Sequence, residues 1–441
     1  MSRKILGFIL GAVLIFGLGV GIGTWVIAKN DKVKPEVAGA SRDKYVAFLD
    51  EVYSTIMSEY WNKLSDQDLI KIFVLGTEKI TGQTQSIKGK EKSELMAMFK
   101  EIVNSYPEEE KKKGFVVTLS DLVLQNLEPF GRSRLYAQKD EKALSDTVSN
   151  VTEVDHYKEL GVDKDASKGE IAAAFEKQKS ELEDAAETDP EAKQKLEEIN
   201  KSYKVLSDDS SKNNYDVAGI DPTVDYKLLA SGVSYIHITK FSPTTFDELV
   251  RATEQLDKGE SDSLIFDLRD NIGGAIDGLP YFLGPFIGND QYAYQFFHQG
   301  DKLDFKTRTG WLNSLVRYKK VVILINKNSQ STAELMAASM KKYNVGVLVG
   351  EATKGWGTVE RVFPLKQQID KSEKYSIFLV HSLTLKEDGE PIEGHGVEPV
   401  IKTADNNWQG QLESYFNYKP LVDAVDSVLK LDGDSKILPL K

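Results

Sequence analysis

The stretch that decides the fold runs from Val321 to Tyr343 and reads VVILINKNSQSTAELMAASMKKY. Its first five residues are apolar and mostly β-branched, which is typical of a buried strand. A polar, turn-forming segment follows at 326–330, and the residues from Thr332 onward have helical composition with one apolar face. The pattern predicts a strand, a tight turn and a helix, with Ser331 at the junction between turn and helix.

Ser331 has two interpretations on this stretch alone. A serine before a helix commonly accepts a hydrogen bond from the first turn, and Glu334 completes the pattern of a capping box. Alternatively, the unpaired N–H groups and partial positive charge of a helix N-terminus favour the alkoxide of a serine nucleophile. The capping interpretation is the commoner one, so the choice depends on the rest of the chain.

Residues 233–401 resemble the C-terminal-processing, or tail-specific, serine peptidase family over their whole length. Five motifs carry the resemblance, in the family's order: VSYIHITKFSPTTFDELVRAT, SLIFDLRDNIGG, STAEL, GEATKGWGTVERVFPL and IEGHGVEPVI. STAEL is similar to the nucleophile motif Ser-x-Ser-Glu, with Ala333 in place of the second serine. The resemblance implies an α/β (α+β) peptidase core in which Ser331 is the nucleophile and Glu334 supports it.

The catalytic base of that family is replaced in this sequence. In the family, a buried and neutral lysine inside Gly-Lys-Gly activates the serine. The corresponding position here is Trp356, and the family's supporting glutamine corresponds to Glu360. Lys354 lies two residues before Trp356, and in an extended chain such residues face the same side. Lys354 is therefore a candidate displaced base, and the alternative is a solvated loop lysine.

The oxyanion side of the family's site is retained. Gly273 and Gly274 follow an Asp-Leu-Arg motif, and Asn271 is kept beside them. Glycines let backbone N–H groups approach a substrate oxygen without a Cβ in the way. The resemblance implies that this turn donates an N–H, that of Gly274, to the developing oxyanion.

Residues 1–40 are predicted to be a membrane anchor and linker. The apolar run at 5–28 follows Arg3 and Lys4 and is long enough to span a bilayer. Its length favours a retained single-pass helix over a cleaved signal peptide. We expect a bacterial cell-membrane protein with most of the chain outside the cytoplasm, an orientation that the family resemblance also favours.

Residues 41–150 carry apolar side chains at helical spacing, and we predict a helical region there. The peptidase core is expected at 223–405, with a C-terminal helical segment at 406–441. In the related peptidases a helical region before the core serves substrate gating or dimer contacts, so the resemblance is compatible with a homo-oligomer.

Residues 151–222 resemble a J-domain, the helical hairpin of co-chaperones, where the peptidase family usually carries a PDZ domain. The apolar positions that carry this resemblance are those expected to form the hairpin core, including Tyr157, Leu160, Ile171, Phe175 and Ile199. The J-domain's functional His-Pro-Asp is replaced by Glu183-Asp184-Ala185, and the preceding helix is rich in acidic residues. A DnaK-type chaperone is therefore not an expected partner.

Bulk composition narrows the functional classes further. The 441 residues carry a net charge of −12, which argues against a general nucleic-acid-binding surface. The chain has no cysteine, which excludes disulfides, thiolate metal sites and a thiol nucleophile. Its five histidines are scattered without metal-ligand spacing. We expect neither a metal nor a cofactor.

Three functions remain from different classes. The first is a membrane-anchored serine endopeptidase that hydrolyses peptide bonds near the C-termini of unfolded or tagged proteins. The second is a pseudo-peptidase that binds such tails as a scaffold or adaptor, because Trp356 occupies the lysine position. The third is a membrane co-chaperone, which the missing tripeptide disfavours. In the first two cases the partners are unfolded or C-terminal segments of other proteins.

Overall fold

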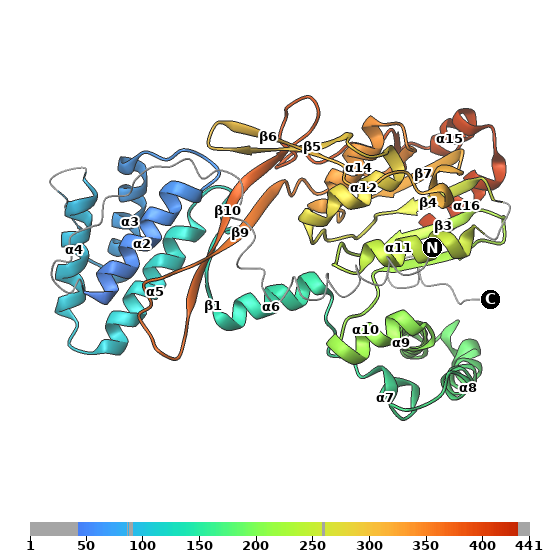
Figure 1. Cartoon of the computed structure of the whole chain (residues 1–441), viewed down its shortest axis with the longest axis horizontal. Helices are drawn as coiled ribbons and strands as arrows, with labels where there is room; N and C mark the ends of the chain where they lie inside the picture. The colour runs from blue at the N-terminus through green and yellow to red at the C-terminus, as the bar shows by residue number, and fades with distance from the viewer. Residues whose placement is uncertain (1–42, 86, 88–90, 258–260, 431–441) are drawn as a thin grey trace, which may run out of the picture. The chain divides into compact units, whose positions relative to one another are not determined.

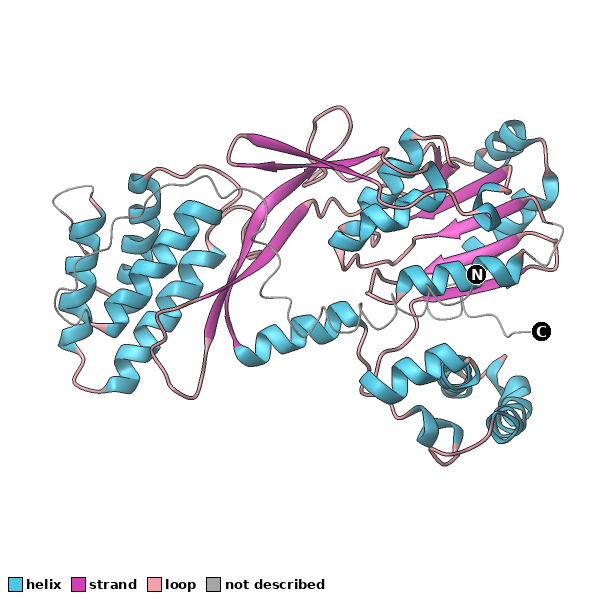
Figure 2. Cartoon of the chain, in the orientation of Figure 1, coloured by secondary structure: helices cyan, strands magenta, loops and turns pink. Residues whose placement is uncertain are grey.

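The computed structural model describes residues 43–85, 87, 91–257 and 261–430. Figure 1 follows the chain through these residues, and Figure 2 separates its helices from its strands. The apolar run at 5–28 lies outside the described residues. Within the described ranges, no helix combines the length and the apolar character needed to cross a bilayer.

A six-stranded sheet forms the centre of the core, with the strand order β11-β8-β7-β4-β3-β2. Neighbours are parallel from β11 to β3, and β2 is added antiparallel at the edge. The strands are β2 (Val224–Leu228), β3 (Ser234–Ile238), β4 (Ser263–Asp267), β7 (Lys320–Ile325), β8 (Val347–Gly350) and β11 (Ile401–Lys402). The apolar run predicted as a buried strand is β7, and all five of its residues from Val321 onward are buried.

Helices cover both faces of this sheet (Figure 2) because its central strands are apolar on both sides. Ile323 and Ile325 of β7 face one layer, and Val322 and Leu324 face the other. The first layer holds α11 (Thr245–Leu256), η1 (Ile276–Gly278), α12 (Leu279–Ile287), α13 (Asn313–Val316) and α14 (Thr332–Lys342). The second holds α15 (Trp408–Phe416) and α16 (Lys419–Leu429).

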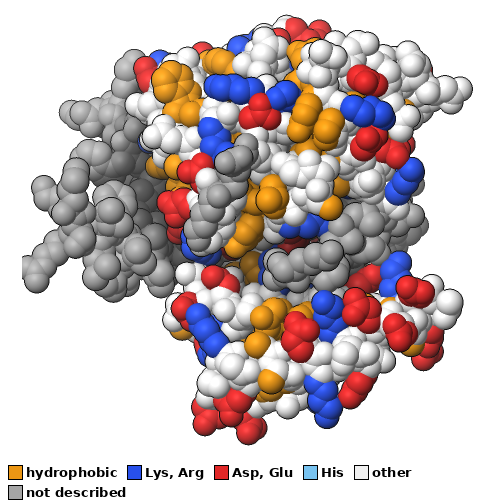
Figure 3. Space-filling model, turned by 90° about the vertical axis from the view of Figure 1, so that its right-hand side faces the viewer, with side chains coloured by type: hydrophobic (Ala, Val, Ile, Leu, Met, Phe, Trp, Pro, Cys, Tyr) orange, Lys and Arg blue, Asp and Glu red, His pale blue; other side chains and the backbone are white. Residues whose placement is uncertain are grey.

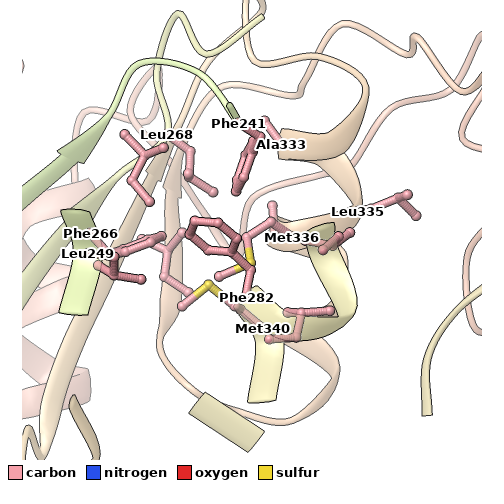
Figure 4. Packing of buried hydrophobic residues seen from close by; sticks show 14 of the residues in the cluster. Phe241, Leu249, Phe266, Leu268, Phe282, Ala333, Leu335, Met336 and Met340 are labelled. Carbon is pink, nitrogen blue, oxygen red and sulfur yellow. The ribbon is translucent and has the colours of Figure 1, made fainter. Parts of the chain in front are cut away.

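The helix α14 rests on an aromatic and sulfur-rich part of the first layer. Met336 and Met340 point toward the rings of Phe241 and Phe282, which meet edge to face at 5.2 Å (Figure 4). Both methionines and both rings are buried, so the start of α14 is fixed against the sheet. This packing positions the turn that precedes the helix.

A second, antiparallel sheet joins the core to the helices near the start of the described chain. It contains β1 (Arg134–Ala137), β5 (Tyr292–His298), β6 (Asp301–Lys306), β9 (Thr358–Pro364) and β10 (Tyr375–Leu385). The helices α2 (Lys44–Glu59), α3 (Asp66–Thr81), α4 (Lys92–Ser105) and α5 (Glu109–Gln125) share one apolar cluster with β10. The segment 41–150 is thus mainly helical but includes β1, a strand that periodicity did not predict, followed by α6 (Gln138–Ser149).

The region that resembles a J-domain forms its own small apolar cluster. Its helices are α7 (His156–Leu160), α8 (Lys168–Ala186), α9 (Pro190–Ser207) and α10 (Asp209–Ala218). The residues expected to form the hairpin core all belong to this cluster. Residues 183–185 lie inside the last turn of α8, and the connection to α9 is the short segment 187–189. On the face shown in Figure 3, basic and acidic side chains are interspersed.

Candidate active site

Ser331 occupies the turn between β7 and α14 in a backbone conformation that non-glycine residues rarely adopt. Its φ is 56° and its ψ is −122°, and such a conformation costs on the order of 1–3 kcal/mol. The Ser331 amide donates a hydrogen bond to Glu334 at 2.8 Å, but the Ser331 hydroxyl does not cap the helix. Only half of the predicted capping box therefore forms. Among the described residues the hydroxyl has no hydrogen-bond partner, so it is free to face a ligand.

Glu334 holds the serine turn and the loop that follows β8 together. This fully buried carboxylate accepts hydrogen bonds from the amides of Ser331, Gly355 and Trp356 at 2.8, 2.7 and 2.8 Å. It also accepts one from the Thr353 hydroxyl at 2.5 Å. Burial raises the pKa of the Glu334 carboxyl, and the four donors oppose that rise. Glu334 thus acts as a structural clamp on both sides of the site.

The double glycine packs directly against the serine. A Cβ added to Gly273 would lie 2.7 Å from the Cβ of Ser331 and 3.1 Å from its Oγ. The Gly273 amide donates to Asn271 Oδ1 at 2.8 Å, and Asn271 Nδ2 donates to the Ile238 carbonyl at 2.8 Å. Asn271 is therefore a positioning residue, and it occupies the N–H of Gly273.

Gly274 presents the available donor of this turn. Within the described residues its N–H has no hydrogen-bond acceptor. Its φ is 137°, and a Cβ there would lie 2.0 Å from the Phe241 carbonyl oxygen, so only glycine fits. Of the two glycines named from the sequence, the geometry leaves Gly274 to donate to an oxyanion.

Thr332 contributes a second donor that sequence reasoning did not identify. It is the first residue of α14, and its N–H has no acceptor in the described part of the chain. Its hydroxyl donates to the Gly274 carbonyl at 3.1 Å, which ties the two turns together. The only sequence signal for this donor is its place directly after the nucleophile, a position that forms oxyanion holes in other serine hydrolases.

The side of the site where a catalytic base would lie is occupied by Trp356 and Lys354. Trp356 is half-buried, and the Arg132 guanidinium carbon lies 3.5 Å from the centre of its ring. Lys354 is exposed, with its Nζ 5.1 Å from the same ring centre. The Lys354 amide donates to the Ser329 carbonyl at 3.0 Å, but no hydrogen bond joins Lys354 Nζ to Ser331 among the described residues. The family's lysine position is thus filled by an indole held under a cation.

Arg132 belongs to the segment between α5 and β1 and reaches this site from far away in the sequence. It donates to Thr358 Oγ1 at 2.9 Å and forms an ion pair with Glu393 at 2.9 Å. Glu393 also accepts a hydrogen bond from the Gly357 amide at 2.8 Å. These contacts fix both the tryptophan and the loop around it.

Glu360 lies next to this arrangement on β9. Its carboxylate accepts a hydrogen bond from the Thr358 hydroxyl at 2.6 Å. Burial raises the pKa of the Glu360 carboxyl, and Thr358 and the Arg132 charge oppose the rise. A carboxylate here would keep a neighbouring lysine charged, which does not suit a general base.

Among the residues that the structure describes, the site therefore contains a free serine hydroxyl and two unpaired N–H groups beside it, but no base in contact with the serine. Such an arrangement can bind a peptide carbonyl. It lacks the proton acceptor that makes a serine strongly nucleophilic at neutral pH.

Two protein-family models match separate parts of this chain. Residues 232–403 match peptidase family S41, and residues 155–216 match the DnaJ domain. These matches confirm both resemblances seen in the sequence motifs.

Two curated relatives come from Bacillus subtilis. The carboxy-terminal processing protease CtpA is 30% identical over 184 residues, which cover 41% of this chain and 37% of the relative. The carboxy-terminal processing protease CtpB is 29% identical over 179 residues, which cover 40% of this chain and 35% of the relative. The match thus spans little more than a third of either relative. Among solved structures, the photosystem II D1 C-terminal processing protease is 14% identical, with a TM-score of 0.46 over 82% of this chain and 93% of that chain.

Proposed function

We propose that this chain, which carries a peptidase family S41 domain preceded by a DnaJ domain, binds the C-terminal segments of other proteins without efficient hydrolysis. The observation that supports this proposal is the state of Ser331. Its hydroxyl has no hydrogen-bond partner within the described residues, and Trp356 under Arg132 fills the place of the base. The N–H groups of Gly274 and Thr332 remain to receive a carbonyl oxygen of the bound tail.

Trp356 gives the proposed site an affinity for peptides. A half-buried indole offers a large rigid surface on which an apolar side chain can stack. The Arg132 guanidinium holds one ring face at 3.5 Å, so little entropy is lost when a ligand packs beside it.

Slow hydrolysis through Lys354 is the second candidate. Its backbone is tied to the serine turn through the Ser329 carbonyl at 3.0 Å, and among the described residues its ammonium has no ion-pair partner. The side chain is exposed and therefore free to change rotamer. Catalytic hydrogen bonds often tighten only when substrate is bound.

The two functions are separated by one set of measurements on the full chain in detergent. An unfolded, fluorescently labelled reporter with a free C-terminus is tested for binding and for cleavage. Tail binding predicts saturable binding with no cleavage above the level of Ser331→Ala. Cleavage that both Ser331→Ala and Lys354→Ala abolish overturns this proposal in favour of the peptidase.

Trp356→Ala tests where the reporter binds. We expect an affinity loss of about tenfold, since stacking on an aromatic ring contributes on the order of 1–1.5 kcal/mol. Trp311→Ala is the matched control, because Trp311 is 69% exposed and its ring packs against Gly288 instead. Equal affinity of the two variants would show that the reporter binds elsewhere.

The membrane anchor at 5–28 and the outward orientation are part of the same proposal. Residues 41–441 would then present the tail-binding site outside the cytoplasm. Protease treatment of intact cells tests this orientation, because an extracytoplasmic domain is digested whereas an inward-facing one survives until the cells are lysed.

A further inference from the structure

A cavity of about 180 Å³ lies between the J-domain-like hairpin and the peptidase core. The hairpin contributes residues of α8, α9 and α10, and the core contributes residues of β2, β3 and α11. None of the residues that build the Ser331 site line it. The cavity therefore requires an explanation of its own.

The acidic side chains around the cavity are already satisfied. Glu248 accepts hydrogen bonds from the amides of Thr223 and Val224 at 2.6 and 3.0 Å. Asp208 caps α10 by accepting from the Ser211 amide at 2.8 Å. Asp225 forms an ion pair with Lys204. Each carboxylate thus has a partner within the protein.

Two basic side chains around the same cavity are not satisfied. Lys227 Nζ is buried and has no hydrogen-bond partner within the described ranges of the chain. Arg251 likewise has no acceptor or ion-pair partner among the described residues. A buried ammonium without an acceptor loses its hydration without compensation. Both cations therefore lack a hydrogen-bonded counter-ion among the described residues.

The same buried environment supports this account of Lys227. Burial lowers the pKa of its ammonium to about 8, while the nearby Asp225 charge opposes the shift. At neutral pH the Lys227 side chain is therefore protonated in most copies of the protein. It is available there to donate to an anion.

Aromatic rings form the apolar part of the wall. Phe175 of α8 and Tyr203 of α9 are stacked with ring centres 4.1 Å apart. Tyr235 lies on the core side, with Lys227 Nζ 5.4 Å from its ring centre. One part of the cavity thus suits an apolar group and another part suits a negative charge.

We propose that this cavity binds an organic carboxylate with a small apolar body, the carboxylate pairing with Lys227 and Arg251 and the body packing against Phe175 and Tyr203. The volume fits a group the size of one amino-acid side chain with its carboxylate. Both a free organic acid and the last residue of a polypeptide have this chemistry. The site goes beyond the proposed binding at Ser331 and does not depend on it.

Calorimetric titration of the full chain in detergent tests the proposal. The probes are N-acetyl-leucine, its amide, and an N-acetylated hexapeptide that ends in leucine with a free carboxylate. We expect the free acid to bind at least about tenfold more tightly than the amide, because a charge-assisted hydrogen bond is lost in the amide. Binding of both acids indicates any organic carboxylate as ligand, whereas binding of the hexapeptide alone indicates chain ends, provided that it persists in Ser331→Ala and is lost in Lys227→Met.

Lys227→Met is the decisive variant, because it keeps the apolar stem and removes the ammonium. We expect at least about a tenfold loss of affinity for the acids, with a melting temperature no lower than that of the wild type, since a buried unpaired charge is removed. Arg251→Met should also lower the affinity for the acids. Lys100→Met, at an exposed position on α4, is the matched control and should change nothing.

Ser331→Ala separates this cavity from the proposed tail-binding site. Binding of N-acetyl-leucine should be unchanged in that variant whether or not the proposal for Ser331 holds. The inference is overturned if neither acid binds saturably, if N-acetyl-leucine and its amide bind with the same measurable affinity, or if Lys227→Met retains wild-type affinity for the acid that binds.

Discussion

The two sides of the Ser331 site differ in the groups that form them, which are backbone amides on one side and side chains on the other. The oxyanion side consists of backbone N–H groups in tight turns, those of Gly274 and Thr332. The base side consists of side chains, with Trp356 held between the loop and Arg132. The first side retains the family's pattern, and the second departs from it.

This difference follows from what each side needs in order to fold. The oxyanion turns depend on glycine conformations and on buried groups such as Asn271 and Glu334, so a change there disturbs the core. The base side tolerates an exchange of side chains as long as the loop's amides keep their acceptor on Glu334. A site can therefore lose its base and keep its shape, and the following experiments examine that separation.

Restoring a lysine at position 356 should have the largest effect, an increase in hydrolysis of the unfolded reporter. In Trp356→Lys combined with Glu360→Gln, the new lysine would lie near Arg132, whose charge favours the neutral amine that acts as a base. We expect hydrolysis of the unfolded reporter to rise on the order of tenfold or more, because a missing catalytic member commonly costs far more than that. The gain should disappear when Ser331→Ala is added. No gain would mean that the oxyanion side does not support hydrolysis even when the lysine is restored.

Gly274→Ala should be the most damaging single change on the oxyanion side. The new Cβ would lie 2.0 Å from the Phe241 carbonyl oxygen at a φ of 137°. We expect the free energy of unfolding to fall by on the order of 3 kcal/mol or more, measured by urea denaturation. Gly278→Ala is the matched control, because a Cβ there meets nothing within 4 Å. Similar losses in both variants would contradict the tight fit at Gly274.

Glu334→Gln should damage both sides at once. The amide group of glutamine would bring an N–H₂ against donors that now meet a carboxylate oxygen, such as the amides of Ser331 and Trp356. We expect a loss of about 2 kcal/mol in the free energy of unfolding. Glu351→Gln, at an exposed position in the same loop, should change it by less than about 0.5 kcal/mol. A neutral effect of Glu334→Gln would refute the clamp.

Arg132→Met should have a smaller effect, confined to the base side. It removes the guanidinium from the Trp356 ring and the ion pair with Glu393, whose side chain is 18% exposed. We expect a loss of about 1–2 kcal/mol in the free energy of unfolding. Arg134→Met removes a more exposed pair with Asp121 and should cost less. If the two variants lose equally, the stack on Trp356 contributes nothing.

The pH dependence of Glu360 should give the smallest signal. Burial raises the pKa of its carboxyl above the ordinary value of 4.5, so the folded protein binds this proton more tightly than the unfolded chain does. Its contribution to stability is therefore present at pH below about 4.5 and is lost as the pH rises through the higher folded value. Thermal unfolding of the wild type and Glu360→Gln from pH 4 to 7 should show the wild type losing stability relative to the variant. A constant difference would mean that the pKa of Glu360 is not raised.

The local parts of this site could be predicted from the sequence because their signals lie within a few residues. The strand before Ser331 follows from a continuous β-branched apolar run, the turn from its polar residues and the helix from its apolar face. The Gly273–Gly274 turn follows a recognisable motif. The structure adds that Asn271 accepts the hydrogen bond of the Gly273 amide, so the Gly274 amide is the unpaired one within the described residues.

The remaining parts could not be predicted because they depend on long-range contacts. Arg132 meets Thr358 across 226 positions, and no periodicity in either segment indicates that contact. The strand β1 was missed because it is only four residues long and pairs with the distant β10. The cavity around Lys227 likewise combines α8 and α9 with β2 and α11, and it exists only after the hairpin has packed against the core.

The single carboxylate of Glu334 connects the turn at Ser331 with the loop at Gly355 and Trp356. It binds the amide of Ser331 and the amides of Gly355 and Trp356 in one group. If a ligand that shifts Trp356 also alters the strained turn at Ser331 through this carboxylate, then occupancy of the Ser331 site alters the affinity at Trp356 by the same factor. Thermodynamic linkage of this kind would couple the binding of a C-terminal tail to the binding of a partner at the loop around Trp356, without hydrolysis of a peptide bond.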